Sequence, residues 1–147
     1  MSQSPTVPPF VNSMMKTILR SPLHNLVSKS VLLISFAGKR SGNLFTTPVS
    51  YSQVGDQITI FTHATWWKNL DQETPVTLRL RGKDIKGYPQ AVSDDKLAIA
   101  EKLAEHLTHV PSDAQYYAVK LDETGRPNMD QVKKAVESVV MIRVSLC

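Results

Sequence analysis

The sequence predicts an α+β, mainly β domain in which an antiparallel sheet closes into a small barrel and helices pack outside it. Two observations lead to this fold class. The patterned segments follow the order helix, several strands, helix, short helix and strand, and most strand segments alternate apolar with polar residues. The length of 147 residues suits one domain with a complete core but not two. We therefore expect a flexible lead and an amphipathic helix in residues 1–30, and a barrel domain in residues 31–147.

The N-terminal segment opens with three prolines within residues 1–9, which predict a flexible lead. Apolar residues then recur at helical spacing, with Lys16 and Arg20 on the opposite side, until Pro22 interrupts the pattern. The apolar positions are Phe10, Met14, Ile18 and Leu19. Core packing is the default role of this stripe, and a lid, a dimer contact and a shallow membrane anchor are the alternatives.

Three strands are expected next. Residues 31–37 form a nearly continuous apolar run, which is typical of a buried strand, and a turn follows. A second strand runs through Val49 and Tyr51, and Gly55-Asp56 predicts a hairpin. The third strand alternates, with one side formed by Ile58, Ile60 and Thr62.

The middle of the chain predicts a short helical turn and two further strands. The helical turn covers residues 66–71 and ends before Pro75. Residues 76–80 alternate cleanly, so one face of this strand is expected to be buried and the other exposed. The next extended run contains Gly87 and Pro89, which predict a bulge or a sheet edge.

A helix follows, for which Ser93 or Asp94 is the expected cap. Its apolar stripe consists of Leu97, Ala100, Leu103, Ala104 and Leu107. His106 and His109 lie three residues apart on this helix, but no further ligand has a suitable spacing. We therefore expect both histidines on a solvated face, and we predict no metal site.

The C-terminal part predicts one short helix and one strand. Residues 128–131 have the form of a capping box, which marks a helix start. The last strand has apolar residues on one side, namely Val140, Ile142, Val144 and Leu146.

The net charge of +4 is unevenly distributed. Residues 1–55 contain five Lys or Arg and no Asp or Glu, whereas the rest contains 12 basic and 13 acidic residues. Such a basic first third attracts an anionic cofactor or an acidic membrane surface. The basic residues are scattered and no recognition motif is visible, so we expect no nucleic-acid partner.

The sequence lacks the patterns of several classes of protein and of site. No segment reaches the roughly 18–20 apolar residues of a transmembrane helix, and the N-terminus lacks the pattern of a signal peptide. The single cysteine, Cys147, allows neither an intrachain disulfide nor a cysteine metal cage. We expect a cytoplasmic protein, and weak contact with a membrane surface through the N-terminal helix is left open.

The most informative motif is the turn Gly38-Lys39-Arg40-Ser41-Gly42. Its glycines let the backbone curl so that successive N–H groups converge on an anion. Side-chain donors suited to a phosphate come from Lys39, Arg40, Ser41, Thr46 and Thr47. The alternative is a solvated hairpin turn without a ligand.

Three motifs in this order resemble the deazaflavin-dependent nitroreductase and quinone reductase family. They are the turn itself, Thr46-Thr47-Pro48, and Trp66-Trp67-Lys68-Asn69-Leu70. The tail from Tyr116-Tyr117 to Asn128 is similar to one subgroup, and the resemblance runs from about Leu23 to the C-terminus. It implies an antiparallel split β-barrel of the FMN-binding, pyridoxamine-phosphate-oxidase-like type, with helices packed outside.

The resemblance also implies an activity. A family member transfers a hydride from reduced 8-hydroxy-5-deazaflavin (coenzyme F-420) to a quinone, a nitro compound or an activated alkene. The protein then holds the ring beside the acceptor and needs neither a nucleophile nor a metal, so no catalytic residue is assigned. The cofactor-binding residues implied are Lys39, Arg40, Ser41, Thr46, Thr47, Pro48, Trp66, Trp67 and Asn69.

For several of these residues, two roles remain open. Trp66 and Trp67 point about 100° apart on a helical turn, so we expect one in the core and the other over the ring, unless both only pack. Asn69 either caps its turn or bonds the cofactor. The substrate-binding candidates are Tyr51, His63, Tyr116 and Tyr117. The last two offer phenol donors to an acceptor oxygen, or simply cover the barrel.

Two departures from the family pattern keep other functions open. Phe45 stands where many members have Arg, and the loop at residues 62–65 is shorter than theirs. An FMN-dependent reductase and a non-catalytic module that sequesters flavin or haem are the alternatives. We also expect a homodimer, through an apolar patch near Phe10, Met14 and Trp67.

Overall fold

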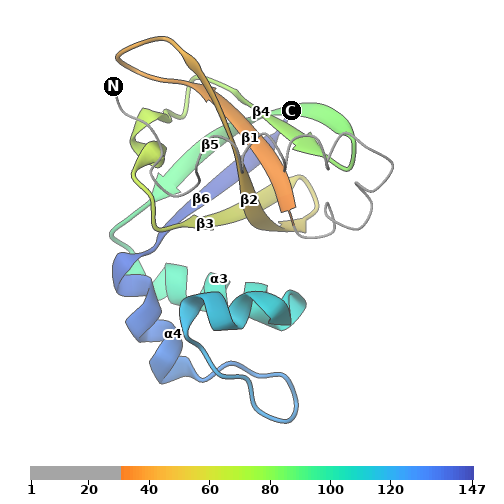
Figure 1. The fold of residues 1–147 in the computed structure, drawn as a ribbon, viewed down its shortest axis with the longest axis vertical. Helices are drawn as coiled ribbons and strands as arrows, with labels where there is room; N and C mark the ends of the chain where they lie inside the picture. Colours follow the sequence, from red (N-terminus) through yellow and green to blue (C-terminus); the bar gives the residue numbers. More distant parts are fainter. Residues whose placement is uncertain (1–30) are drawn as a thin grey trace.

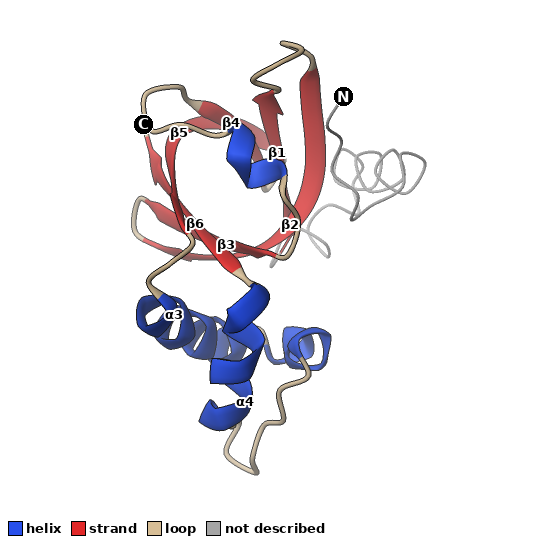
Figure 2. Cartoon of the chain, turned by 90° about the vertical axis from the view of Figure 1, so that its left-hand side faces the viewer, coloured by secondary structure: helices blue, strands red, loops and turns tan. Residues whose placement is uncertain are grey.

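Antiparallel strands close into a barrel in the computed structural model of this chain, which describes residues 31–147. The strand order around the barrel is β1-β2-β3-β6-β5-β4, and Figure 2 shows the ring with the helices on one side. The strands are β1 (Val31–Ala37), β2 (Leu44–Val54), β3 (Gln57–Thr62), β4 (Val76–Leu80), β5 (Lys83–Val92) and β6 (Val140–Leu146). The predicted fold class is confirmed. The expected N-terminal lead and amphipathic helix lie outside the described residues.

The barrel interior is filled by the apolar side of each alternating strand. Because successive side chains of a strand point to opposite faces, every second residue enters the interior. Leu32, Ile34 and Phe36 do so from β1, and Ile58 and Ile60 from β3. The interior is therefore the core that the alternation in the sequence predicts.

A second core lies outside the barrel, under the helices that connect β5 to β6 (Figure 1). These helices are α3 (Lys96–His109), the 3₁₀ helix η2 (Pro111–Tyr117), α4 (Met129–Ala135) and the 3₁₀ helix η3 (Val136–Ser138). Leu103 and Leu107 of α3 pack with Phe61 of β3 and Met141 of β6. Among residues 31–147, no helix combines the length and apolarity that crossing a membrane requires.

The structure corrects the start and the stripe of α3. Its N-cap is Asp95, whose side chain accepts from the Ala98 N–H, and not Ser93 or Asp94. Leu97 is 67% exposed, while Ile99 is fully buried. The start lies one or two residues later than expected. The buried stripe includes Ile99 and His106 in place of Leu97 and Ala104, because this is the face that packs against the second core. At α4, Asn128 accepts from the Gln131 N–H, as the capping box predicts.

The feature that positions the site is a separation of β2 from β3. The two strands pair only from Tyr51↔Ile60 to Val54↔Gln57. Before Tyr51, β2 pairs with β1 alone, over residues 44–50, and the end of β3 pairs with β6. The barrel is thus split between β2 and β3.

The region of Gly87 and Pro89 differs from the expectation. β5 pairs with β4 through Gly87, and with β6 from Gly87 to Val92, without a break in register. The predicted bulge is therefore wrong, and β5 as a whole is not an edge strand. Pro89 lies past the end of the β4 ladder, so its missing N–H affects one neighbouring strand at most.

Gly87 is required by close strand approach. A Cβ at this position would lie 2.5 Å from Val144 Cγ1 and 2.9 Å from the backbone oxygen of Ser145. Backbone cannot give way as a flexible side chain does. We therefore expect Gly87→Ala to lower the free energy of unfolding by about 1–3 kcal/mol, the cost of overpacking. Urea unfolding measures this change.

The control for this variant is Lys86→Ala, whose side chain is exposed on the same strand. This expectation is contradicted if the free energy of unfolding of Gly87→Ala lies within about 0.5 kcal/mol of the wild-type value, which is the usual range for surface substitutions.

Candidate functional site

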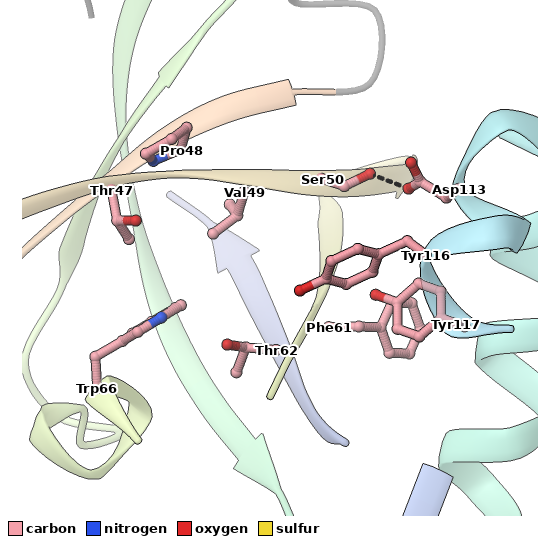
Figure 3. Close-up of a pocket in the computed structure, with 10 residues that line it drawn as sticks. All are labelled: Thr47, Pro48, Val49, Ser50, Phe61, Thr62, Trp66, Asp113, Tyr116 and Tyr117. Carbon is pink, nitrogen blue, oxygen red and sulfur yellow. Dashed lines mark hydrogen bonds between the residues drawn. The ribbon is translucent and has the colours of Figure 1, made fainter. Parts of the chain in front are cut away.

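A cavity of about 350 Å³ opens in the split between β2 and β3. The 3₁₀ helix η1 (Trp66–Asn69) closes one side of it and η2 closes the other (Figure 3). We call it the tyrosine cavity, and its lining residues are Thr47, Pro48, Val49, Ser50, Phe61, Thr62, Trp66, Asp113, Tyr116 and Tyr117. It is a largely aromatic and apolar space with hydroxyl groups at several points.

A second cavity, of about 370 Å³, lies at the turn between β1 and β2. We call it the cationic cavity, and its lining residues are Gly38, Lys39, Arg40, Ser41, Phe45, Thr65, Lys68 and Asn69. Three of these side chains are cationic and none is acidic. Such a lining favours an anion, and a phosphate in particular.

The backbone of the turn offers few unpaired N–H groups to an anion. Gly42 has φ +71°, a conformation that favours glycine. The N–H groups of Gly38 and Gly42 donate to carbonyl oxygens within the turn. Those of Lys39 and Asn43 donate to Asn69 Oδ1 and Ser41 Oγ. Because these N–H groups are already paired, the side chains must supply most of the donors for an anion.

Asn69 ties the turn to η1. Its Oδ1 accepts from the Lys39 N–H at 3.0 Å, and its Nδ2 donates to the Trp66 carbonyl oxygen at 3.0 Å. The second bond is the local, capping-type contact that was one of the two expectations for Asn69. The first bond joins elements 30 residues apart. The two cavities therefore share η1, which gives Trp66 to one and Lys68 to the other.

An aromatic stack runs from one cavity to the other. The Phe36 ring lies 5.2 Å from Trp66 and 5.9 Å from Phe45, with both pairs stacked. Trp66 is 3% exposed and lines the tyrosine cavity, while Phe45 lines the cationic cavity. Phe45, the departure from the family pattern, thus has a packing role at the wall of the cationic cavity.

Four of the residues expected at the site line neither of the two cavities, namely Thr46, Tyr51, His63 and Trp67. Thr46 Oγ1 lies 2.8 Å from Ser35 Oγ. Tyr51 is buried in the barrel interior, and this burial raises the pKa of its phenol. Trp67 is half-buried, with Lys68 Nζ 5.9 Å from its ring centroid.

The homodimer expected through the apolar patch near Phe10, Met14 and Trp67 stays a prediction.

Tyr116, Tyr117 and His63 form a ring cluster at the mouth of the tyrosine cavity. The His63 ring lies 5.5 Å from each tyrosine ring, and the two tyrosine rings are 5.0 Å apart, edge to face. Although the His63 residue is exposed, partial desolvation beside the tyrosines lowers its pKa, so its imidazole is mostly neutral at pH 7. Burial, and then the Asp113 charge, raise the pKa of Tyr117 well above its usual value. Both groups are therefore mostly uncharged.

Asp113 joins three elements at the wall of this cavity. Its Oδ2 accepts from the Ser50 hydroxyl on β2, and it lies 2.8 Å from His106 Nε2 on α3. Burial alone would raise the pKa of Asp113, but the bonds from His106 and Ser50 outweigh it and hold this pKa below its usual value. The carboxylate is therefore ionised at neutral pH.

The expected solvated face is wrong for His106 and right for His109. His106 is 1% exposed and packs against the Phe61 ring at 5.4 Å, whereas His109 is exposed. His106 follows Leu103 by three residues, so the helical period of the apolar stripe could have placed it inside. Within residues 31–147, no cluster of His, Cys, Asp or Glu could hold a metal ion.

The bonds to Asp113 predict a pH dependence of stability. Because the folded protein lowers the pKa of Asp113, ionised Asp113 stabilises it above the ordinary carboxyl pKa of about 3.9. This contribution is lost as the pH falls through the lowered value. We expect the stability difference between the wild type and Asp113→Asn to shrink between pH 7 and about pH 3, as measured by urea unfolding. A difference that stays constant over this range contradicts the assignment.

Solved structures share this fold. A candidate 5-nitroimidazole antibiotic resistance protein from Bacteroides thetaiotaomicron superimposes with a TM-score of 0.55 at 10% identity, over 84% of this chain and 76% of that one. An FMN-binding protein related to pyridoxamine 5'-phosphate oxidase, from Nostoc punctiforme PCC 73102, gives 0.54 at 10% identity, over 96% and 82%. A domain-swapped dimer gives 0.51 at 14% identity, over 92% and 97%. At these identities the likeness shows the fold alone.

The sequence itself identifies the family. No curated protein matches the chain, but the model of the F420H2-dependent quinone reductase family matches residues 14–128. This range includes the cationic turn, η1 and the two tyrosines of η2. Because the match spans most of the chain, the protein belongs to the F420H2-dependent quinone reductase family and is an oxidoreductase.

Proposed function

We propose that this protein binds a reduced deazaflavin coenzyme by its phosphate in the cationic cavity and reduces a quinone in the tyrosine cavity. The observation that carries the proposal is the joining of two chemically different cavities by η1. One cavity offers cations, and the other offers aromatic walls and hydroxyl donors. A flat ring that carries a phosphate needs both kinds of surface.

The residues of the cationic cavity fit a phosphate. Lys39 and Lys68 supply ammonium groups, Arg40 a guanidinium, and Ser41 a hydroxyl. Charge-assisted bonds from these groups are stronger than bonds between neutral partners. The coenzyme, when bound, supplies the hydride. The role of these four side chains is to fix its phosphate end.

The tyrosine cavity fits a flat, uncharged acceptor. Val49, Phe61 and Trp66 supply apolar walls that exclude water. The hydroxyl groups of Tyr116, Tyr117 and Thr62 point into the cavity (Figure 3). Because the raised pKa of Tyr117 keeps its phenol protonated, it can donate a hydrogen bond to an acceptor oxygen. Such a bond orients the acceptor and stabilises negative charge that develops on it.

Nitro compounds and activated alkenes are further acceptors in the proposal, since a nitro or carbonyl oxygen accepts the same bonds. Anaerobic stopped-flow oxidation of reduced deazaflavin with menadione tests the activity. We expect faster oxidation with the protein than without it. If reduced FMN is consumed instead, the FMN-dependent alternative replaces the proposal. If neither is consumed faster, the non-catalytic module that binds flavin or haem replaces it.

The cationic cavity yields a prediction for coenzyme binding. Changing Lys39 and Arg40 together to Ala removes two of its three cations. We expect binding to weaken by up to about 3 kcal/mol per charge, the scale of charge-assisted bonds. Fluorescence titration of deazaflavin at fixed salt measures this loss.

The matched control is Lys83→Ala with Lys86→Ala, which removes two exposed charges from β5. It should leave the affinity within about twofold, because exposed charges at a distance are screened. Equal affinity of the wild type and the Lys39/Arg40 variant rejects the phosphate assignment.

The tyrosine cavity yields a prediction for turnover. Tyr116→Phe keeps the ring but removes a hydroxyl, and we expect kcat/KM for menadione to fall about two- to tenfold, the value of one hydrogen bond. Tyr88→Phe is the control, because Tyr88 is an exposed tyrosine of β5 that lines neither cavity. Equal losses in the two variants would show that the Tyr116 hydroxyl has no specific role.

A further inference from the structure

We propose that Asp113 makes the tyrosine cavity select uncharged acceptors and reject anionic ones. This inference rests on the proposed function, because it concerns the acceptor. The observation that leads to it is that Asp113 is the one charged side chain in the lining of this cavity within the described residues. Its side chain is 24% exposed, so its charge is only partly screened by water.

The hydrogen bonds around Asp113 fix the carboxylate in its ionised form. The Ser50 hydroxyl and His106 Nε2 both lie against the same oxygen, Oδ2. An ionised carboxylate accepts both bonds, and each of them favours that form. A fixed negative charge therefore belongs to the permanent surface of the cavity.

His106 lies behind this carboxylate and not at the surface of the cavity. It is 1% exposed, and it is absent from the lining of the tyrosine cavity, which includes Asp113. Its Nε2 lies 2.8 Å from Asp113 Oδ2. The charged group that faces the cavity is therefore the Asp113 carboxylate.

Among the described residues, His63 lies beside this cavity, and partial burial lowers its pKa, so its imidazole is mostly neutral at pH 7. Tyr116 and Tyr117 bring no positive charge. Among the described residues, an acceptor in the tyrosine cavity therefore meets the negative charge of Asp113. A sulfonate or carboxylate on the acceptor is repelled, whereas a neutral quinone is not.

The Asp113 charge also distinguishes the tyrosine cavity from the cationic cavity. Lys39, Arg40 and Lys68 attract anions to the cationic cavity, while Asp113 repels them from the tyrosine cavity. An anionic group of the coenzyme is thereby directed to the first cavity, and the space for the acceptor stays free of it. The same two features thus set the orientation of one ligand and the chemical class of the other.

The test compares binding of 1,2-naphthoquinone with binding of its 4-sulfonate by the full chain. Quenching of tryptophan fluorescence measures both affinities without coenzyme, since Trp66 lines the cavity. In the wild type we expect the neutral quinone to bind about tenfold more tightly than the sulfonate. In Asp113→Asn, which has nearly the same shape, the ratio should shrink at least fivefold. The comparison of ratios removes the effect of the sulfonate's size.

Glu101→Gln is the control, because it removes the same charge from an exposed position of α3. It should leave the ratio of affinities within twofold of the wild type. If the Asp113 variant folds poorly, titrations of the wild type at about 20 and 500 mM salt replace it, and the preference should weaken at high salt.

An unchanged ratio in Asp113→Asn, or failure of both quinones to bind, overturns the inference. Binding with the expected preference, but without oxidation of reduced deazaflavin, refutes the proposed function instead. The two failures are therefore distinguishable.

Discussion

The site depends on where β2 stops pairing with β3. The Tyr51↔Ile60 pair is the last one between these strands, and β2 then follows β1 alone. The separated segments carry Thr47 to Ser50 on one side and Phe61 and Thr62 on the other. A barrel with full pairing here would fill this space with a continuous ladder. The short ladder leaves room for a cavity in an otherwise densely packed barrel, and η1 and η2 only close its ends.

Most of the fold follows from local patterns in the sequence. The alternation in β3 and β4 and the capping box at Asn128 each reflect a constraint that acts within a few residues. Several differences between prediction and structure arise where the outcome depends on distant parts of the chain. Gly87 predicts a bulge or a sheet edge, but it is needed because β6 passes within contact distance. Nothing near Gly87 in the sequence reports the position of Val144.

The candidate site shows the same limit. The turn of residues 38–42 was visible because its donors are neighbours in the sequence, and its position at a cavity agrees with that reading. The expected backbone nest was weaker, since Asn69, 30 residues away, takes one of its N–H groups. Asp113 was missed altogether, because its partner Ser50 is 63 residues away. The polarity of His106 predicts a solvated position, whereas its helical spacing from Leu103 places it in the buried stripe, as the structure shows.

Among the described residues, the connection between β5 and β6 contributes Asp113, Tyr116 and Tyr117 to one cavity and nothing to the other, whose lining comes from residues 38–69. Under the proposed function, mutations, insertions or exchange of this helical segment alter the preferred acceptor while coenzyme affinity is retained. In evolutionary terms, the part of the acceptor cavity that comes from this connection is inherited on a separate stretch of sequence from the cationic cavity. A lineage could change its oxidising substrate without passing through variants that have lost the reductant.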